Sequence, residues 1–400
     1  MRPLLELRAE NFRSLRDVTV GLEPLNVLVG PNGAGKSNLL DVIRFLSDSA
    51  RADLRPALDR RGGYERMRFR GKSSGKIRIS VRANVTTHSS PTAPDEYDLA
   101  FSLDRSRNGP EARHLLVREE SFRFKRTQGR GRRITVRGST VDLVDTGGKP
   151  GTERTQRLGL RRDALGLAAL ARLSPDQGGD EIERVASLFS TFRVFDPDVP
   201  AARLPSKITE DPLRENAANL ASFLYLLHER SGSFDDLEDD ARAMVPGLRS
   251  IRFQDVGGTT SAIAVQLEEQ GLATPTDLAD ASYGTIRALA LLALLYDPDP
   301  PLLTCIEEID HGLHPYVFDR LVELLRAASE KTQFLIATHS PAFVNRLTPE
   351  ELIVCERDES GASKIPAVES SVIRQMEDAT EGRLRLGELW FTGSLGGVPA

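Results

Sequence analysis

One segment of eight residues constrains the fold of this chain more than any other part of the sequence. It reads Gly30-Pro31-Asn32-Gly33-Ala34-Gly35-Lys36-Ser37, and Asn38 follows it. An apolar run over 25–29 precedes the segment and reads as a buried strand, whereas the residues after it are apolar at helical spacing. Strand, glycine loop and helix in this order are the context in which G-x-x-x-x-G-K-[ST] indicates a phosphate-binding P-loop.

The residue types of this loop suit a nucleotide and its metal ion. The glycines let several backbone N–H groups converge on one phosphate chain, and the start of the helix adds its dipole. Lys36 places a cation on the outer phosphates, and the hydroxyl of Ser37 suits Mg²⁺. A glycine-rich turn with a chance lysine is the alternative, and both flanks argue against it. We therefore expect a nucleotide-binding loop in an α/β fold of the P-loop NTPase type.

The composition is that of an ordinary soluble protein. The chain has 400 residues, of which 40% are hydrophobic and 28% charged. No stretch approaches the ~20 apolar residues that cross a bilayer, and residues 1–6 read as the start of a strand rather than as a signal peptide. Cys305 and Cys355 lie in apolar runs and form neither a disulfide framework nor a C-x-x-C metal pair. We expect a cytoplasmic protein without membrane contact.

The net charge of −5 hides an asymmetry along the chain. Residues 1–140 carry 28 Lys and Arg against 16 Asp and Glu, whereas residues 141–400 carry 25 against 42. The basic excess lies in 51–82 and 101–140, within the region 51–140, and includes Arg130, Arg132 and Arg133. Such an excess is typical of a face that binds nucleic acid without sequence preference. It is equally typical of solvated strands that face an acidic lobe of the same fold.

The hydrophobic periodicity divides the chain into three segments: 1–145, 146–270 and 271–400. The first alternates like an antiparallel meander with one wet, basic face, the second is mainly helical with a strand pair, and the third returns to α/β. The expected strands of the first two segments are 4–15, 17–22, 76–82, 98–103, 121–125, 133–137, 248–253 and 262–267. The expected helices of the second are 158–173, 181–192, 216–229 and 236–244, too short for long coiled-coil arms. In the third we expect helices at 285–295, 315–329 and 341–346, with strands at 301–306, 333–337 and 351–356.

Two adjacent acids follow a buried strand in the third segment. Beside a P-loop, Glu307 suits the Mg²⁺ shell as the Walker B acid, and Glu308, pointing the other way, suits the polarisation of an attacking water. His339 ends the next strand and could reach the γ-phosphate and sense hydrolysis. Ser282 and Gly284 open a helix that could bind an anion, although an ordinary helix cap explains them equally well.

These motifs occur in an order that resembles an ABC-type ATPase head of the RecF/SMC branch. Within that branch the chain is similar to coil-less bacterial predicted ATPases of the AAA family that are related to the ATPase half of OLD nucleases. The likeness spans nearly the whole chain. Beyond the motifs already described, it rests on Asn11-Phe12-Arg13-Ser14-Leu15, Gly312-Leu313-His314-Pro315 and Gly387-Glu388-Leu389-Trp390.

The resemblance implies a two-lobed head, with two heads closing face to face on two ATP molecules. ATP and Mg²⁺ are then the cofactors, and the chain is its own partner. Ser282 and Gly284 would cap the γ-phosphate bound by the partner chain, Asp310 would lie at the dimer seam, and His339 would be the switch. Three features depart from the family pattern: Ala281 replaces a leucine, Ile309-Asp310 replaces Pro-Glu, and 55–75 offers no glutamine for a Q-loop.

The sequence leaves four interpretations of function open. The first is an ATP-driven switch that gates a separately encoded effector, a nuclease by expectation, in phage defence or genome maintenance, because the chain lacks the acids of a TOPRIM nuclease. The second is a RecF-like repair ATPase whose basic region holds DNA. The third is a transporter subunit, which Ser282-Tyr283-Gly284 does not fit. The fourth keeps ATP as a structural ligand with negligible turnover.

Overall fold

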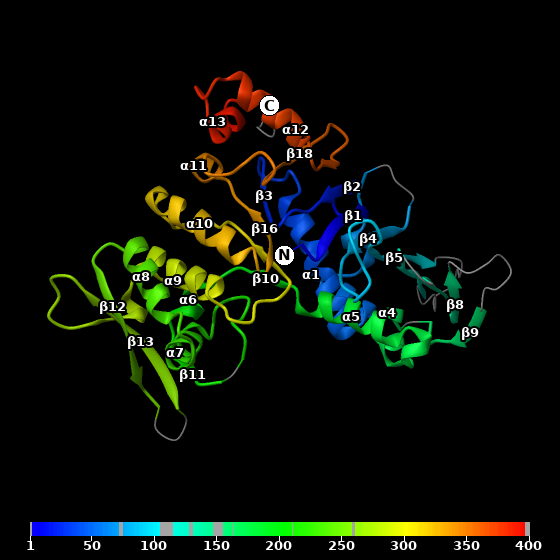
Figure 1. Cartoon of the computed structure of the whole chain (residues 1–400), viewed down its shortest axis with the longest axis horizontal. Helices are drawn as coiled ribbons and strands as arrows, with labels where there is room; N and C mark the ends of the chain where they lie inside the picture. Colours follow the sequence, from blue (N-terminus) through cyan, green and yellow to red (C-terminus); the bar gives the residue numbers. More distant parts are fainter. Residues whose placement is uncertain are drawn as a thin grey trace.

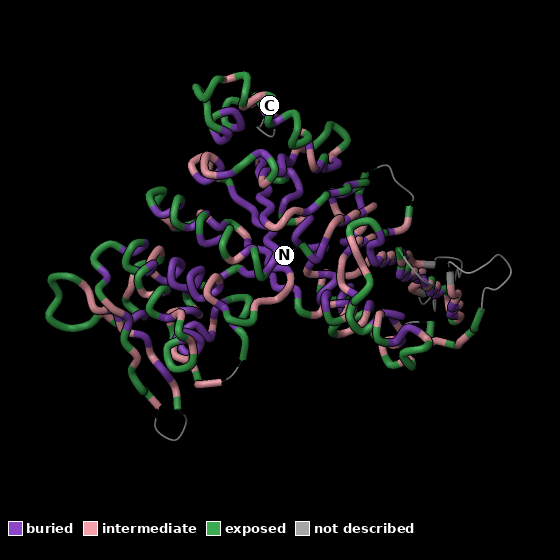
Figure 2. The backbone as a smooth tube through the Cα atoms, viewed as in Figure 1, coloured by how far each residue is buried: buried purple, intermediate pink, exposed green. Residues whose placement is uncertain are grey.

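A computed structural model describes residues 2–71, 75–104, 115–127, 131–146, 155–162, 164–209, 211–257 and 261–396. A parallel sheet lies at the centre of the molecule, with a large antiparallel sheet on one side and a helical lobe on the other (Figure 1). Burial follows the same plan, because the central strands are buried throughout, whereas the outer elements alternate between buried and exposed residues (Figure 2). The expected α/β architecture with a meander and a helical lobe is confirmed.

The central sheet is parallel throughout and is covered on both faces. Its order is β10 (Arg193–Phe195), β15 (Leu303–Ile306), β16 (Gln333–Ala337), β3 (Leu25–Val29) and β17 (Leu352–Val354). Side chains alternate between two hydrophobic cores: Val27 packs in one, whereas Leu28 packs in the other. A parallel sheet with two buried faces reads as a continuous apolar run, which is why the sequence revealed these strands.

Helices of different origin cover the two faces. The helix that follows the P-loop, α1 (Lys36–Ala52), packs with α5 (Gly179–Thr191) in the core shared with the antiparallel sheet. The other core contains α9 (Tyr283–Leu295) and α10 (Phe318–Ala328). It also includes the lobe formed by α6 (Val199–Ala202), α7 (Leu220–Arg230), α8 (Phe234–Met244), β12 (Leu248–Asp255) and β13 (Ala262–Glu269).

The antiparallel sheet extends the expected meander by two strands. Its order is β2 (Leu15–Gly21), β1 (Leu4–Phe12), β4 (Ile77–Ala83), β5 (Asp95–Asp104), β6 (Leu115–Phe124), β7 (Gly131–Arg137), β8 (Thr140–Thr146) and β9 (Thr155–Gly159). The buried amide of Gln333 joins it to the central sheet, because Nε2 donates to Leu4 O and Oε1 accepts from Leu4 N. These two hydrogen bonds therefore link the central sheet to the antiparallel sheet.

The solvent-exposed face of this sheet is polar, as expected, but it carries both basic and acidic side chains. Arg78 lies 3.9 Å from Asp98 on the neighbouring strand, and Arg82 lies 3.3 Å from Glu6. On the other face of the sheet, which carries the buried Ile134 and Val136, Arg132 pairs with Asp145 at 3.1 Å and donates to the carbonyl of Asp176, so its cation already has partners. Arg133 is exposed, and Arg130 lies outside the described residues. The face expected to be basic therefore also carries acids, because cross-strand pairing sets carboxylates beside the arginines.

The helix expected over 158–173 was also wrong in its first half. Residues up to Gly159 belong to β9, and only α4 (Gly166–Ala169) and a 3₁₀ turn at Leu170–Arg172 are helical. The chain between them is anchored by the buried Arg118, which donates to the carbonyls of Arg161 and Ala164. Pairing with β8 therefore overrides the local helical spacing.

The remaining elements complete the covering of the core. They are α2 (Leu54–Asp59), α3 (Tyr64–Met67), β11 (Ser206–Lys207), β14 (Thr276–Asp277), α11 (Pro341–Val344), β18 (Glu356–Arg357), β19 (Ser363–Lys364), α12 (Ser370–Ala379) and α13 (Leu386–Phe391), with 3₁₀ turns at Pro175–Gln177, Leu278–Asp280 and Pro315–Val317. None of the helices in the described ranges is both long enough and apolar enough to span a membrane. The division into three segments stays a prediction.

Candidate active site

The glycine loop connects the central strand β3 to α1, as the motif requires. Gly30 has a φ of +150°, and a Cβ atom there would lie 2.2 Å from the carbonyl oxygen of Cys355. A side chain at this position would therefore collide with the backbone that follows β17. Gly33 and Gly35 have left-handed φ values of +82° and +108°. The loop can follow its tight course only with glycine at these places.

The lysine of the loop is buried under its own backbone. Lys36 is only 5% exposed, and its Nζ donates to the carbonyl oxygens of Gly30 at 2.7 Å and Pro31 at 3.1 Å. Burial lowers the pKa of the Lys36 ammonium, and the carboxylates of Glu308 and Asp310 oppose this shift. A buried cation on neutral carbonyl groups fits an anionic ligand, because phosphate oxygens are stronger partners for an ammonium.

Some of the other loop residues are exposed to solvent, and others hold the loop in place. Asn32, Gly33 and Ser37 are exposed, and Ala34 is buried. Asn38, expected at the nucleotide, donates its amide to Ser14 Oγ at 2.7 Å. Ser14 also shares a hydrogen bond of 2.6 Å with Ser363 Oγ. Asn38 therefore ties the P-loop helix to the β1–β2 turn and to β19.

The two acids after β15 have different surroundings. Glu307 is half-buried, and its Oε1 lies 3.2 Å from Nη2 of Arg44 on α1. Burial raises the pKa of the Glu307 carboxyl, and the Arg44 cation opposes that shift. The Glu308 side chain is 61% exposed and stands on a backbone with φ of +49°. One acid is held against the P-loop helix, and the other faces solvent.

A buried arginine fixes the backbone of both acids. Arg287 on α9 is 2% exposed, and its Nη2 donates to the carbonyls of Glu307 at 3.1 Å and Glu308 at 2.7 Å. Sequence reasoning missed this residue and Arg44. A lone arginine inside the apolar run 286–294 was the available signal for Arg287, because a cation is buried only where it finds acceptors.

His339 and Asp310 meet beside the loop. The Asp310 carboxylate accepts hydrogen bonds from the Thr338 hydroxyl and, at 3.4 Å, from the backbone N–H of His339. Burial lowers the pKa of the His339 imidazole, the Lys36 cation lowers it further, and Asp310 and Glu308 oppose the shift. Lys36, Glu308, Asp310 and His339 thus lie near enough to influence one another electrostatically.

The Ser282–Gly284 segment forms the beginning of α9. Ser282 is the helix N-cap, since its Oγ accepts from the Thr285 N–H at 3.1 Å. Both Ser282 and Tyr283 are exposed. Gly284 approaches the turn after β15 so closely that a Cβ there would lie 2.6 Å from Gly312 O. The cap geometry and an anion-binding role are compatible, because a helix start presents N–H groups to solvent.

The residues present also fit a magnesium ion that arrives with a nucleotide. Mg²⁺ usually takes one or two protein ligands and completes its shell with phosphates and water. The exposed hydroxyl of Ser37 and the carboxylate of Glu307 would supply these protein ligands. Among the residues that the structure describes, no three His, Cys, Asp or Glu side chains form a group that could hold a metal alone.

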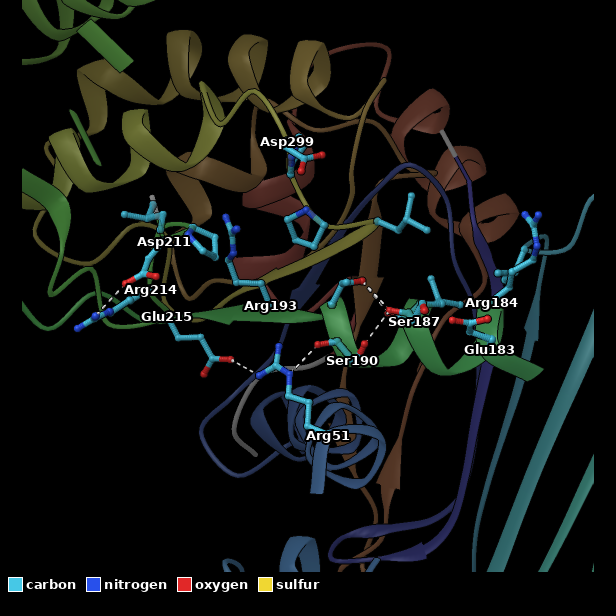
Figure 3. A pocket seen from close by; sticks show the side chains of 18 of the residues that line it. Arg51, Glu183, Arg184, Ser187, Ser190, Arg193, Asp211, Arg214, Glu215 and Asp299 are labelled. Carbon is cyan, nitrogen blue, oxygen red and sulfur yellow. Dashed lines mark hydrogen bonds and ion pairs between the residues drawn. The ribbon is translucent and has the colours of Figure 1, made fainter. Parts of the chain in front are cut away.

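A cleft of about 1300 Å³ lies elsewhere, at the amino ends of the central strands. Figure 3 shows Arg51, from the far end of α1, between the backbone of Ser190 and the carboxylate of Glu215. Arg193, at the start of β10, also lines this cleft. The cleft contains none of the expected site residues, so the candidate active site is the group around the P-loop.

Comparison with known proteins identifies the family of the chain. Residues 25–345 match the family described as "AAA domain, putative AbiEii toxin, Type IV TA system". The chain belongs to this family. Together with the similarity to Rad50, RecF and OLD proteins, this match supports an ABC-type ATPase of the RecF/SMC branch.

Three curated relatives share short stretches with the chain. The Rad50 double-strand break repair ATPase of Sulfolobus acidocaldarius is 38% identical over 85 residues, 21% of this chain and 9% of the relative. The RecF replication and repair protein of Beutenbergia cavernae is 32% identical over 107 residues, 26% and 23%. The OLD nuclease of Thermus scotoductus is 44% identical over 55 residues, 14% and 10%. The chain thus covers less than a quarter of each relative.

Among solved structures, the Smc head domain of Pyrococcus furiosus bound to the C-terminal domain of ScpA has the same fold. The likeness covers 95% of this chain and 100% of that one, with a TM-score of 0.50 and 14% identity. It supports the fold of an ABC-type ATPase head.

Proposed function

We propose that two copies of this chain close face to face on two ATP molecules, so that each site is completed by the partner. In each site Lys36 would hold the outer phosphates, Ser37 and Glu307 would hold Mg²⁺, and Glu308 would orient and polarise the attacking water. Bound Mg²⁺ would neutralise phosphate charge. Ser282 and Gly284 of the partner subunit would cap the γ-phosphate, with Asp310 at the seam and His339 as the switch.

The observation that carries this proposal is the exposure of Glu308 and of the Ser282–Gly284 segment, the groups that would meet the partner chain. Glu308 and Tyr283 are 61% and 41% exposed, and both belong to segments whose backbones are fixed from within. Arg287 holds the carbonyl of Glu308, and the cap of Ser282 holds the start of α9. Rigid, solvent-facing functional groups favour a ligand or partner that covers them.

We further propose that closure of the dimer gates a separately encoded effector, a nuclease by preference, in phage defence or genome maintenance. The family description, with its toxin of a toxin–antitoxin system, and the likeness to an OLD nuclease support this proposal. A RecF-like repair ATPase is the alternative, and the names of the Rad50 and RecF relatives support it. The partners of Arg132 weaken that alternative, because an arginine already paired contributes less to phosphate binding.

The first experiment replaces the proposed base. Glu308→Gln keeps the size of the side chain and removes the basic oxygen, and loss of a general base typically slows a reaction ~10²–10⁴-fold. We expect phosphate release to fall by about this factor and the variant to accumulate as a dimer in ATP and Mg²⁺ on size-exclusion chromatography. Wild-type turnover, or a variant that stays monomeric under these conditions, would contradict the proposal.

A mixing experiment tests whether the site is composite. Ser282→Arg places bulk where the partner's γ-phosphate must dock, so this variant alone should stay monomeric with ATP. In a mixed dimer with Glu308→Gln, one site combines the altered Glu308 of one chain with the altered Ser282 of the other. The second site combines the wild-type Glu308 with the wild-type Ser282. Recovery of some turnover in the mixture supports sharing between chains. If Ser282→Arg dimerises and turns over like the wild type, the shared site is excluded.

A further inference from the structure

The turn after β15 places the His311 side chain beside Glu308, the proposed general base. The His311 N–H donates to the carbonyl of Glu308 at 2.9 Å, which closes the turn. On the same side, His311 Nδ1 lies 3.4 Å from Glu308 Oε2. Glu308 itself has a φ of +49°, a backbone conformation that side chains rarely adopt. Strained backbone of this kind persists where the surroundings fix it, and it gathers at functional sites.

The same histidine packs on the segment that opens α9. The rings of His311 and Tyr283 have centroids 5.4 Å apart and are tilted by 44°. Gly312 permits this approach, because a Cβ at its left-handed position would lie 2.5 Å from the Tyr283 ring. The side chains of Tyr283, His311 and Glu308 therefore form a continuous contact from the Ser282–Gly284 segment to the proposed base.

We propose that His311 is a positioning residue for Glu308, and that its packing on Tyr283 makes the orientation of Glu308 depend on what docks at the Ser282–Gly284 segment. This inference rests on the proposed role of Glu308. In a face-to-face dimer that segment belongs to the other ATP site, so the contact joins the two sites within one chain. A site would then become competent for hydrolysis when its neighbour has closed.

Removal of the imidazole tests the positioning role. Misplacement of a catalytic group by about 1 Å can cost ~10²-fold in rate, so we expect His311→Ala to lower kcat about tenfold or more. KM for ATP should stay within about twofold, because the His311 side chain is not itself among the groups expected to hold the nucleotide. His311→Asn keeps an N–H donor near the position of Nδ1 and should recover most of kcat. A kcat within twofold of the wild type in His311→Ala, or no recovery in His311→Asn, would overturn the proposal.

His228 supplies a matched control. Its Nδ1 lies 3.2 Å from a Glu229 carboxylate and its ring lies 4.9 Å from that of Phe234, so it repeats the glutamate–histidine–ring arrangement on α7. His228→Ala should leave kcat within twofold. A comparable loss in His228→Ala would show that removal of any such histidine slows the enzyme, and the positioning role would fall.

Double variants separate this inference from the proposed function. If His311 acts through Glu308, His311→Ala should add little to the loss already caused by Glu308→Gln. Tyr283→Leu should likewise add little to His311→Ala, and fully additive losses would exclude the link to Tyr283. Wild-type turnover in Glu308→Gln would refute the proposed base itself. A large loss in Glu308→Gln with none in His311→Ala would refute only the positioning role.

Discussion

Both ends of the central sheet are lined by charged side chains, and the two ends use them differently. At the amino ends, arginines meet carboxylates: Arg193 lies 2.9 Å from Asp297. Arg51 lies 3.8 Å from Glu215 (Figure 3). At the carboxyl ends, the buried ammonium of Lys36 rests on neutral carbonyl groups. A charge matched within the chain stabilises the fold, whereas a cation on weak acceptors can exchange them for a ligand. We therefore infer a structural role for the arginine–carboxylate pairs at the amino ends and a ligand-binding role for Lys36 at the carboxyl ends.

The largest effect should come from the P-loop lysine. Lys36→Ala removes the only fixed cation that the loop supplies to the outer phosphates, so we expect tight ATP binding to be lost, by ~10²-fold or more in Kd. Isothermal titration with ATP and Mg²⁺ measures this change. Arg51→Ala removes a cation from the opposite end of the same helix and should leave ATP affinity within about twofold. ATP affinity that survives Lys36→Ala within a few-fold would remove the assignment of the loop.

The carboxyl end could be predicted because its signals are local. The P-loop, the paired acids and His339 each lie at the end of an apolar run, and parallel strands bring such ends to one edge of a sheet. The contacts of these residues could not be predicted in the same way. Arg44 on Glu307, Arg287 on two carbonyls and His311 on Tyr283 depend on packing between segments far apart in the sequence.

In the antiparallel sheet, too, the contacts between distant segments could not be predicted from the sequence. Alternation predicted all of its strands except β8 and β9, but a count of charges could not show that Arg78 would lie beside Asp98 or that Arg132 would face Asp145. Such pairs are set by the register between strands, which no single strand encodes. The helix expected over 158–173 failed for a related reason, because the edge of β8 and the buried Arg118 decide the course of that chain.

The second prediction concerns the amino end. The side chains of Arg193 and Asp297 are 9% and 5% exposed, and removal of one partner from a buried pair typically costs about 3–5 kcal/mol. We expect Asp297→Ala to lower the free energy of unfolding by about this amount in urea denaturation. ATP affinity of the folded variant should change little.

Asp211 provides the control for that measurement. It pairs with Arg214 at 3.3 Å in the same cleft, but the two side chains are 51% and 56% exposed. Exposed pairs contribute about 0–1 kcal/mol, so Asp211→Ala should scarcely change stability. Equal losses in Asp211→Ala and Asp297→Ala would show that burial does not distinguish these pairs.

The smallest effect is electrostatic and belongs to the carboxyl end. Burial and the Lys36 cation both hold the pKa of His339 below its ordinary value, so the imidazole is neutral at pH 7. Because the folded pKa lies below that of the unfolded chain, the unfolded state binds the proton more readily. This contribution to stability is therefore present above the unfolded pKa of about 6.5 and is lost as the pH falls toward the folded pKa. It should be small, because His339 is exposed, which weakens the effect of burial on its pKa.

Two charge-removing variants should move this pKa in opposite directions. Lys36→Met keeps the length of the side chain without its cation and should raise the pKa of His339, whereas Asp310→Asn removes an opposing carboxylate and should lower it. NMR titration measures both shifts, and His339→Asn identifies the resonance among the six histidines. A pKa that Lys36→Met leaves unchanged would mean that the lysine and the histidine do not share one electrostatic site. In that case the carboxyl end would lose the coupling that a switch histidine needs to sense the charge beside the P-loop.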